Sequence, residues 1–429
     1  MLNDIFVLSR LILNNLPTNS IGDYLKSKGL YNEFLKARKN KVDYSDFIAD
    51  LVTNYVISIQ ELDEFLFDSL FYGIHKNNYI SYIEHIGVID ESKLFERLDL
   101  YYKKNSEFIN IVGNTLRETN NRLVALKLVK KNNVLQTVKL LYGIIVKLKT
   151  QNGIEDAYSY IPIEIDYLQK RVCIRVAPKA GLAEDYYKPT YIKQRFTEEI
   201  MQLFGITYIE INNDIFNTIY KISRTLIDDV YEKMHGNTLF DDESDILKIT
   251  NQIEHILYKN GLTITKNMSQ EYGIFDIFKN VKSLMNNAIV LKKIIKTFNI
   301  SEIQLDGYLL YLKYQDKDEY NITLKSDTDE TISFSETFLR IKSDLDEFRY
   351  VSAIKVIWNL VHDKKLELKY RFYDTVSLNI RFYADTTEGD FFYALEKFEE
   401  FRQKDIKIIS RVDRTYVTDE DEESQPDVI

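Results

Sequence analysis

A predicted strand in the C-terminal part of the chain carries the residue pair with the best-defined catalytic chemistry. Glu367 and Lys369 are separated by one residue. In many metal-dependent nucleases such a Glu-x-Lys pair supplies a carboxylate for Mg²⁺ and a lysine that stabilises the attacked phosphate. These sites also need an upstream carboxylate, for which Asp344, Asp346 and Asp363 are candidates. Side chains alternate between the two faces of a strand, so residues two apart such as Glu367 and Lys369 lie on the same face, and on an amphipathic strand that is commonly the solvent face. The pair therefore also has a purely structural explanation, and a nuclease is expected only as an alternative function.

Other catalytic and metal-binding motifs are missing from the sequence. It contains no G-x-G-x-x-G, G-x-x-x-x-G-K or G-x-S-x-G segment, which argues against the phosphate-binding loops and the nucleophile turn that these motifs form. Cys173 is the only cysteine, so thiolate metal clusters within one chain are excluded. We therefore expect no cofactor and no metal site, with Mg²⁺ required only under the nuclease alternative. The five histidines are too far apart in the sequence for a helical His-x-x-x-His pair: His75, His85, His235, His255 and His362.

Positive charge is concentrated in one segment of an acidic protein. The chain has 56 basic and 66 acidic residues, a net charge of −10, which disfavours indiscriminate binding to nucleic acid or anionic lipid. Residues 101–150 nevertheless contain 10 basic and 2 acidic residues, whereas residues 51–100 contain 3 and 9. A smaller basic cluster near the N-terminus contains one acidic residue, Glu33, beside Lys26, Lys28, Lys36, Arg38, Lys39 and Lys41.

The basic segment predicts a surface that binds phosphates or the carboxylates of a partner. Lysine and arginine neutralise phosphates and release counterions, which gives sequence-independent affinity for nucleic acid. Residues 117–131 are expected to be helical, and at about 100° per residue their cations spread over more than half of the helix circumference. The strands that follow place their cations on one outer face. The candidate binding residues are Arg122, Lys127, Lys130, Lys131, Lys139, Lys147, Lys149, Arg171 and Arg175.

These features favour a non-enzymatic cytosolic binding or scaffold subunit whose basic segment contacts nucleic acid or an acidic protein partner. An alternative that needs no external ligand is that the basic surface is solvated or docks against the protein's own acidic stretch 51–100. Two further alternatives are a metal-dependent nuclease effector of a mobile-element or antiviral defence system, and a phage or plasmid structural protein. No membrane partner is expected, because the longest apolar run, Leu140 to Val146, is too short to span a bilayer.

The period of the apolar residues changes along the chain. Up to about residue 135 they recur at three- and four-residue spacing, which is typical of helices. Ser58 and Glu61 have the Ser-x-x-Glu spacing of a capping box, which predicts a helix over 59–75. Strict alternation over 138–149, 159–167 and 172–176 then predicts three strands, and their short connections predict an antiparallel meander.

The later part of the chain predicts helices over 193–233 and 243–298 and strands near 320–325 and 332–334. An amphipathic stretch, 336–361, precedes a predicted hairpin with its turn at Asp374 and Thr375. A helix over 389–403 and a strand over 407–412 complete the expected elements.

The whole pattern predicts an α+β fold, in which an N-terminal helical domain is followed by antiparallel β-meanders interleaved with helices. The expected division is a helical domain at 1–135, a mixed α+β domain at 136–335, a helix, hairpin and helix at 336–416, and an acidic disordered tail at 417–429.

Overall fold

The structure is a computed structural model of the chain. It describes residues 8–74, 76–88, 90–102, 108–114, 122–151, 153–211, 213–235, 243–265, 268, 276–296, 304–315, 320–326, 330–335, 337–338, 350–361 and 364–403. The fold is α+β, as the sequence predicts.

Contacts between residues divide the described chain into two compact units. The first unit contains the chain up to Asn213 and returns at Leu368–Glu400, and the second contains Asp214–Glu367 and the last described residues, 401–403. These boundaries differ from the sequence-based divisions at 135 and 335, because segments near the end of the chain complete the first unit.

The described part of the first unit begins with five helices. They are α1 (Arg10–Leu13), α2 (Ser20–Ser27), α3 (Tyr31–Arg38), α4 (Tyr44–Thr53) and α5 (Ile59–Tyr72). The Ser58 side chain accepts from the Glu61 N–H, and the Glu61 carboxylate accepts from the Ser58 N–H, so the predicted capping box is confirmed. The helix that it starts buries Leu66, Leu70 and Phe71 along one face.

An antiparallel sheet forms the centre of the first unit. Its strand order is β2-β3-β4-β5-β1-β11-β10, and the short strand β6 pairs with β1. The predicted meander is confirmed as β3, β4 and β5, and the predicted hairpin is confirmed as β10 and β11. The strands are β1 (Asn77–Ile86), β2 (Arg122–Lys131), β3 (Val134–Thr150), β4 (Gly153–Asp166), β5 (Arg171–Val176), β6 (Ile206–Tyr208), β10 (Lys365–Asp374) and β11 (Ser377–Phe382).

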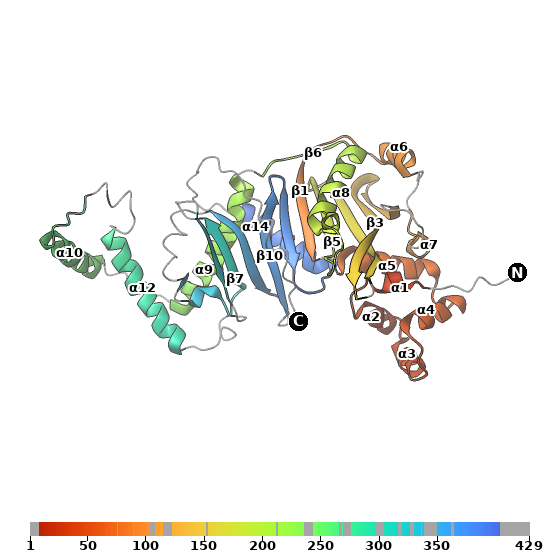
Figure 1. Ribbon diagram of the computed structural model, residues 1–429, viewed down its shortest axis with the longest axis horizontal. Helices are drawn as coiled ribbons and strands as arrows, with labels where there is room; N and C mark the ends of the chain where they lie inside the picture. The colour runs from red at the N-terminus through yellow and green to blue at the C-terminus, as the bar shows by residue number, and fades with distance from the viewer. Residues whose placement is uncertain are drawn as a thin grey trace. The chain divides into compact units, whose positions relative to one another are not determined.

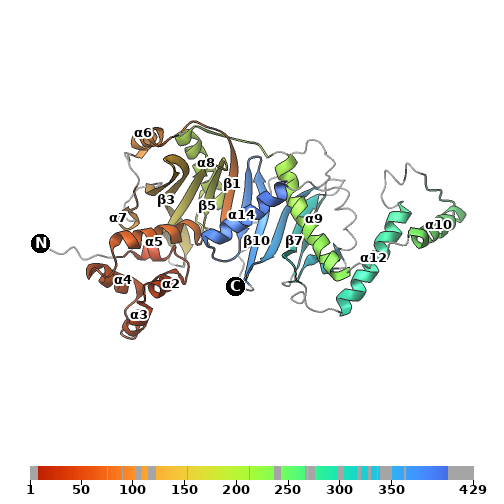
Figure 2. The ribbon, with the colours of Figure 1, turned by 180° about the vertical axis from the view of Figure 1, so that it is seen from behind.

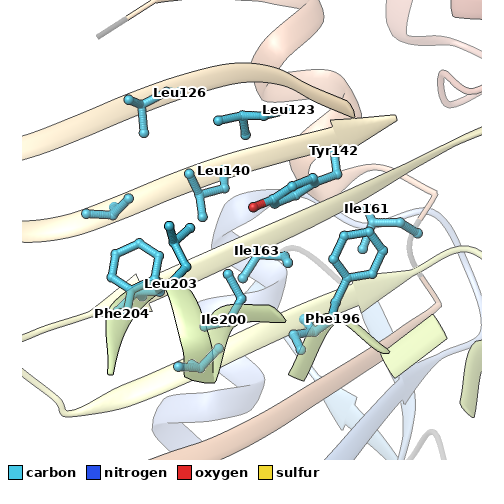
Figure 3. Packing of buried hydrophobic residues seen from close by; sticks show 14 of the residues in the cluster. Leu123, Leu126, Leu140, Tyr142, Ile161, Ile163, Phe196, Ile200, Leu203 and Phe204 are labelled. Atoms are coloured by element: carbon cyan, nitrogen blue, oxygen red, sulfur yellow. The ribbon is translucent and has the colours of Figure 1, made fainter. Parts of the chain in front are cut away.

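One face of this sheet packs against helix α8 (Pro189–Phe204). Proline occupies the first turn of α8, and Gly205, with φ of 61°, ends it in the left-handed region that suits glycine. Ile192, Phe196 and Ile200 recur every four residues and enter the core, which Figure 3 shows from close by. Their partners on the sheet include Leu140, Tyr142, Ile161 and Ile163.

The opposite face of the sheet is also covered. Helix α8 lies in front of the sheet in Figure 1, whereas α5 and α14 (Glu388–Gln403) lie in front of it in Figure 2. The Tyr370 hydroxyl of β10 donates to the Ala394 carbonyl of α14 at 2.7 Å. This sheet therefore has two buried faces, whereas the sequence pattern predicted one buried and one outer face.

Helices α6 (Glu91–Tyr102) and α7 (Ile111–Asn114) lie between β1 and β2 in the sequence. Asp63 of α5 is buried and accepts from the N–H groups of Ile111 and Val112 at the start of α7. The first helical turn thus obtains an acceptor for two N–H groups that have no partner within the helix.

Among its described residues, the second unit combines helices with three antiparallel strands. Its strand order is β9-β7-β8, and Leu305, Tyr308 and Ile357 form a core with Val230 of α9. Helix α10 packs against α12. The elements are α9 (Asn213–His235), α10 (Glu243–Lys259), α12 (Ile277–Lys296), β7 (Gly307–Gln315), β8 (Asn321–Lys325) and β9 (Val351–Asn359).

Several expected elements differ in the structure. Residues 122–131, expected as helix, form strand β2, and the expected helical domain also contains strand β1. Ile332–Phe334 is a short 3-10 helix rather than a strand, and the stretch 336–361 contains strand β9. The predicted strand over 407–412 and the acidic tail lie outside the described residues. No helix in the described parts of the chain has the length and apolarity needed to cross a bilayer.

Candidate nucleic-acid interface

Five of the nine candidate cations form ion pairs with carboxylates of the protein itself. Two of the carboxylates, Asp68 and Glu91, belong to the acidic stretch 51–100, so the structure contains the internal docking that was one alternative. The pairs are Lys127–Asp68 at 3.5 Å, Lys130–Glu91 at 2.7 Å, Lys139–Glu388 at 3.1 Å, Arg171–Asp166 at 3.0 Å and Arg175–Glu164 at 2.7 Å.

Arg175 is completely buried rather than on an outer face. Its guanidinium carbon lies 4.9 Å from the ring centroid of Phe71, 4.8 Å from that of Tyr72 and 4.3 Å from that of Phe391. One amino group donates to Glu164, while Nε and Nη1 have no hydrogen-bond acceptor among the described residues. Ring faces attract a cation, so aromatic packing and one carboxylate together hold this charge inside the unit.

A chain of polar contacts connects the Arg175 pair to helix α14. The Tyr72 hydroxyl donates to Glu388 at 2.7 Å and lies 3.4 Å from Glu164, and Lys139 also donates to Glu388. Burial raises the pKa of the Tyr72 hydroxyl far above its ordinary value. Burial alone would raise the pKa of Glu388, but the hydrogen bonds from Tyr72 and Lys139 outweigh it and leave that pKa lowered. This network fixes α5 and α14 to the sheet.

The four remaining candidates do not form one surface. Arg122 is half-buried near Tyr158, whose pKa burial raises to about 12. Lys131, Lys147 and Lys149 are exposed and form no ion pair with the described residues. Lys131 lies opposite Val134 at the start of β3, so it is separated from the other two by about 45 Å of extended strand.

In the smaller N-terminal cluster, a larger share of the cations forms no ion pair with the described residues than in the basic segment. Lys26 pairs with Asp23 and Lys28 with Glu61. The other four cations are exposed, lie within six residues at the end of α3, and make no ion pair with the part of the chain that the structure describes. We call Lys36, Arg38, Lys39 and Lys41 the α3 cluster.

The Glu-x-Lys pair of the nuclease alternative lies on strand β10, as expected. Glu367 forms an ion pair with Lys355 of β9, the strand that precedes β10 in the sequence. The candidate upstream carboxylates Asp344, Asp346 and Asp363 lie outside the described residues, so the geometry of a complete site is not defined. Within the described residues, no three side chains of the metal-ligating types are gathered around one point.

Some partners of the predicted site residues could have been found from the sequence and others could not. The register of β4 and β5 places Arg171 directly opposite its ion-pair partner Asp166, so alternation and hairpin pairing suffice to match these two charges. Lys139 lies opposite Glu164 but pairs with Glu388 instead. Glu388 follows Lys139 by 249 residues. Nothing in the local pattern indicates such a contact.

Comparison of the chain with protein-family models, with curated proteins and with solved structures finds no match.

Proposed function

We propose that this protein is a non-enzymatic cytoplasmic binding subunit that contacts the phosphates of a nucleic acid through the α3 cluster. The observation that carries the proposal is the density of unpaired positive charge: four exposed cations occur within six residues. Elsewhere the chain neutralises many of its cations with its own carboxylates, as the five pairs of the basic segment illustrate.

The physical basis is counterion release. A site that neutralises four phosphates of a duplex loses affinity with a salt slope of about −3.6, or about 100-fold between 50 and 200 mM salt. The overall charge of −10 opposes binding at other surfaces, so contact is restricted to the cationic cluster. Lys131, Lys147 and Lys149 supply further exposed positive charge on the first unit.

The cations of the α3 cluster could also serve to stabilise the end of helix α3, and the test must separate this role from phosphate binding. Cations at the end of a helix interact favourably with the helix dipole. Lysine and arginine are therefore replaced with glutamine, which removes the charge without adding an unfavourable negative one. The test variant carries Lys36→Gln, Arg38→Gln, Lys39→Gln and Lys41→Gln.

The matched control removes exposed cations from another helix of the same unit. Lys93→Gln and Arg97→Gln on α6 serve this purpose, combined with Lys170→Gln and Lys259→Gln to equalise the total charge. All four control residues are exposed in the structure. Fluorescence anisotropy with labelled single-stranded DNA, duplex DNA and RNA measures binding at 50 and 200 mM salt.

We expect the α3 variant to bind at least one nucleic acid tenfold more weakly or worse at 50 mM salt, with a salt slope flatter by about 3 to 4. The control variant keeps the affinity of the unmodified chain. Equal binding by the two variants would overturn the proposal. Binding of a polyglutamate probe but of no nucleic acid would also overturn it and would identify an acidic protein as the partner.

A further inference from the structure

Helices α2, α3 and α4 end in the same backbone motif. After each of them the chain turns through a residue in the left-handed conformation: Gly29 (φ 73°), Lys41 (φ 67°) and Tyr55 (φ 59°). The N–H of the residue that follows bonds back to a carbonyl in the last helical turn, as from Val56 to Leu51 at 2.9 Å. This Schellman motif satisfies carbonyls at the end of a helix, and its left-handed residue is most often glycine.

Glycine takes this conformation without a steric cost, whereas a residue with a β carbon does not. Helices α2 and α10 have glycine there, Gly29 and Gly261. Of the two exceptions, Lys41 is a member of the α3 cluster. Tyr55 gains nothing from burial, because it is 94% exposed. A tyrosine at this position therefore serves neither the backbone nor the core.

Tyr55 belongs to a small apolar surface between α4 and α5. Val56 and Ile59 are both more than half exposed. Single exposed apolar residues are common, but three within five positions mark a contact surface. We call Tyr55, Val56 and Ile59 the α4–α5 tip.

The α3 cluster and the α4–α5 tip lie at opposite ends of helix α4. Lys39 and Lys41 precede this helix and Tyr55 follows it. The ring of Phe34 on α3 stacks on that of Tyr44 on α4, with centroids 4.2 Å apart, so the two helices pack directly. Helix α4 has 10 residues and is about 15 Å long. At about 3.4 Å per stacked base, roughly five nucleotides cover that length.

We propose that Tyr55 of the α4–α5 tip stacks on an unpaired base, which makes a single-stranded nucleic acid the ligand of the α3 cluster. Proteins that bind single strands combine cations for the backbone with exposed aromatic rings for the bases. Inside a duplex the base faces are already stacked on neighbouring pairs and are closed to a side chain. This inference rests on the function proposed for the α3 cluster and adds the class of nucleic acid.

The test compares oligo(dT) with an abasic strand of equal length, because the two carry the same phosphates and only the first carries bases. Fluorescence anisotropy of labelled strands at low salt measures binding to the intact chain. We expect Tyr55→Gly to weaken binding of oligo(dT) by about fivefold or more and to leave binding of the abasic strand unchanged. The α3 variant weakens binding of both strands, since it removes contacts to phosphates.

Further measurements separate stacking from folding. Glycine suits the left-handed position, so Tyr55→Gly should unfold at the same temperature as the unmodified chain or at a higher one. Tyr55→Trp keeps an aromatic ring, and the chain's own tryptophan, Trp358, is buried. The fluorescence that this variant adds should be quenched by oligo(dT) and not by the abasic strand. Tyr258→Ala removes another exposed tyrosine and, as the matched control, keeps the affinity of the unmodified chain.

Three results would overturn the inference. One is an equal effect of Tyr55→Gly on the two strands, including no effect on either. Another is a lower unfolding midpoint for Tyr55→Gly, which would assign the ring a structural role. The third is Tyr55-dependent binding to anionic lipid vesicles by a chain that binds neither strand. If Tyr55→Gly has no effect but the α3 variant still weakens binding, the function proposed for the α3 cluster stands and only the stacking role fails. If the unmodified chain binds no nucleic acid, both fail.

Discussion

The guanidinium of Arg175 is fully buried, so its charge must be compensated by groups inside the protein. Its charge is balanced by Glu164, and neither side chain is more than 5% exposed. Removing one member of such a pair leaves the other charged and buried, which costs about 3–5 kcal/mol, whereas replacing both with apolar groups costs much less. The pair therefore behaves as a single unit in which each residue depends on the other.

This dependence predicts strong coupling in a double-mutant cycle. Arg175→Met and Glu164→Leu should each lower the free energy of unfolding by about 3 kcal/mol or more, and the double variant should lose clearly less than the sum. Urea unfolding followed by circular dichroism measures all four proteins. Additive losses would show that the two side chains do not interact.

Cys173 lies between Arg171 and Arg175 on β5 and is buried. Burial raises the pKa of its thiol to about 11, so the thiolate that reacts with labelling reagents is scarce at neutral pH. We expect no reaction with a chromogenic disulfide reagent at pH 8 while the protein is folded, and one equivalent of thiol after unfolding in guanidinium. Rapid labelling of the folded chain would contradict the burial of this strand.

The lowered pKa of Glu388 predicts a contribution to stability that depends on pH. A carboxyl whose folded pKa lies below its unfolded value stabilises the protein above the unfolded pKa, near 4.5, and loses that effect as pH falls through the folded pKa. Lys139→Met removes one of the hydrogen bonds that lower this pKa. The difference in unfolding midpoint between Lys139→Met and the unmodified chain should be largest at pH 6–7 and shrink below about pH 4. A difference that is constant across this range would exclude Glu388 as its source.

At the scale of single elements, the capping box explains where α5 begins. Ser58→Ala removes the acceptor for the Glu61 N–H and should lower the free energy of unfolding by about 1 kcal/mol. Glu61→Gln retains an oxygen that can accept from the Ser58 N–H, so it should destabilise the protein less. Chemical denaturation of both variants measures the difference. A larger loss for Glu61→Gln would instead make the Lys28–Glu61 ion pair the main contribution.

Strands whose sequence alternates between apolar and polar residues were predictable, even where both faces are buried, as in β4 and β11; strands without such alternation were not. Strands β3 and β4 and the β10–β11 hairpin alternate, so their position and pairing follow from the sequence. Seven consecutive residues from Asn77 on in β1 are buried, and a short run of this kind has no period that separates strand from helix. The same limit explains why β2 was expected as a helix.

The contacts of the candidate cations also divide into those that hairpin register predicts and those between residues far apart in the sequence. Charges that face each other across the meander can be matched by hairpin register, as for Arg171 and Asp166. The covering of Arg175 by Phe391 joins residues that are distant in the sequence, and no periodicity indicates it. The outer basic face expected from alternation was wrong at Arg175 because α5 and α14 cover that side of the sheet.

At the scale of the whole molecule, the first unit is assembled from both ends of the chain. β1 pairs with β11, and Tyr72 donates to Glu388 across 316 positions. A chain that ends after residue 363 lacks β10, β11 and α14, which leaves β1 with an unpaired edge and Arg175 without Phe391.

We therefore expect this shortened chain to be insoluble or to unfold without a cooperative transition, because exposed strand edges and apolar faces associate with other chains. Co-expression of residues 364–429 as a separate polypeptide should restore soluble protein. Solubility, light scattering and near-ultraviolet circular dichroism provide the measurement. A soluble shortened chain with a sharp unfolding transition would show that the N-terminal part folds without its C-terminal strands.

The pairing of β1 with β11 also sets a delay during synthesis on the ribosome. The Asn78 side chain donates to the Ile380 carbonyl, 302 residues further along the chain. At about 5–20 residues per second, translation takes roughly 15–60 s to produce that partner. For this interval the nascent polypeptide carries an open strand and uncovered aromatic side chains, which are the features that chaperones bind.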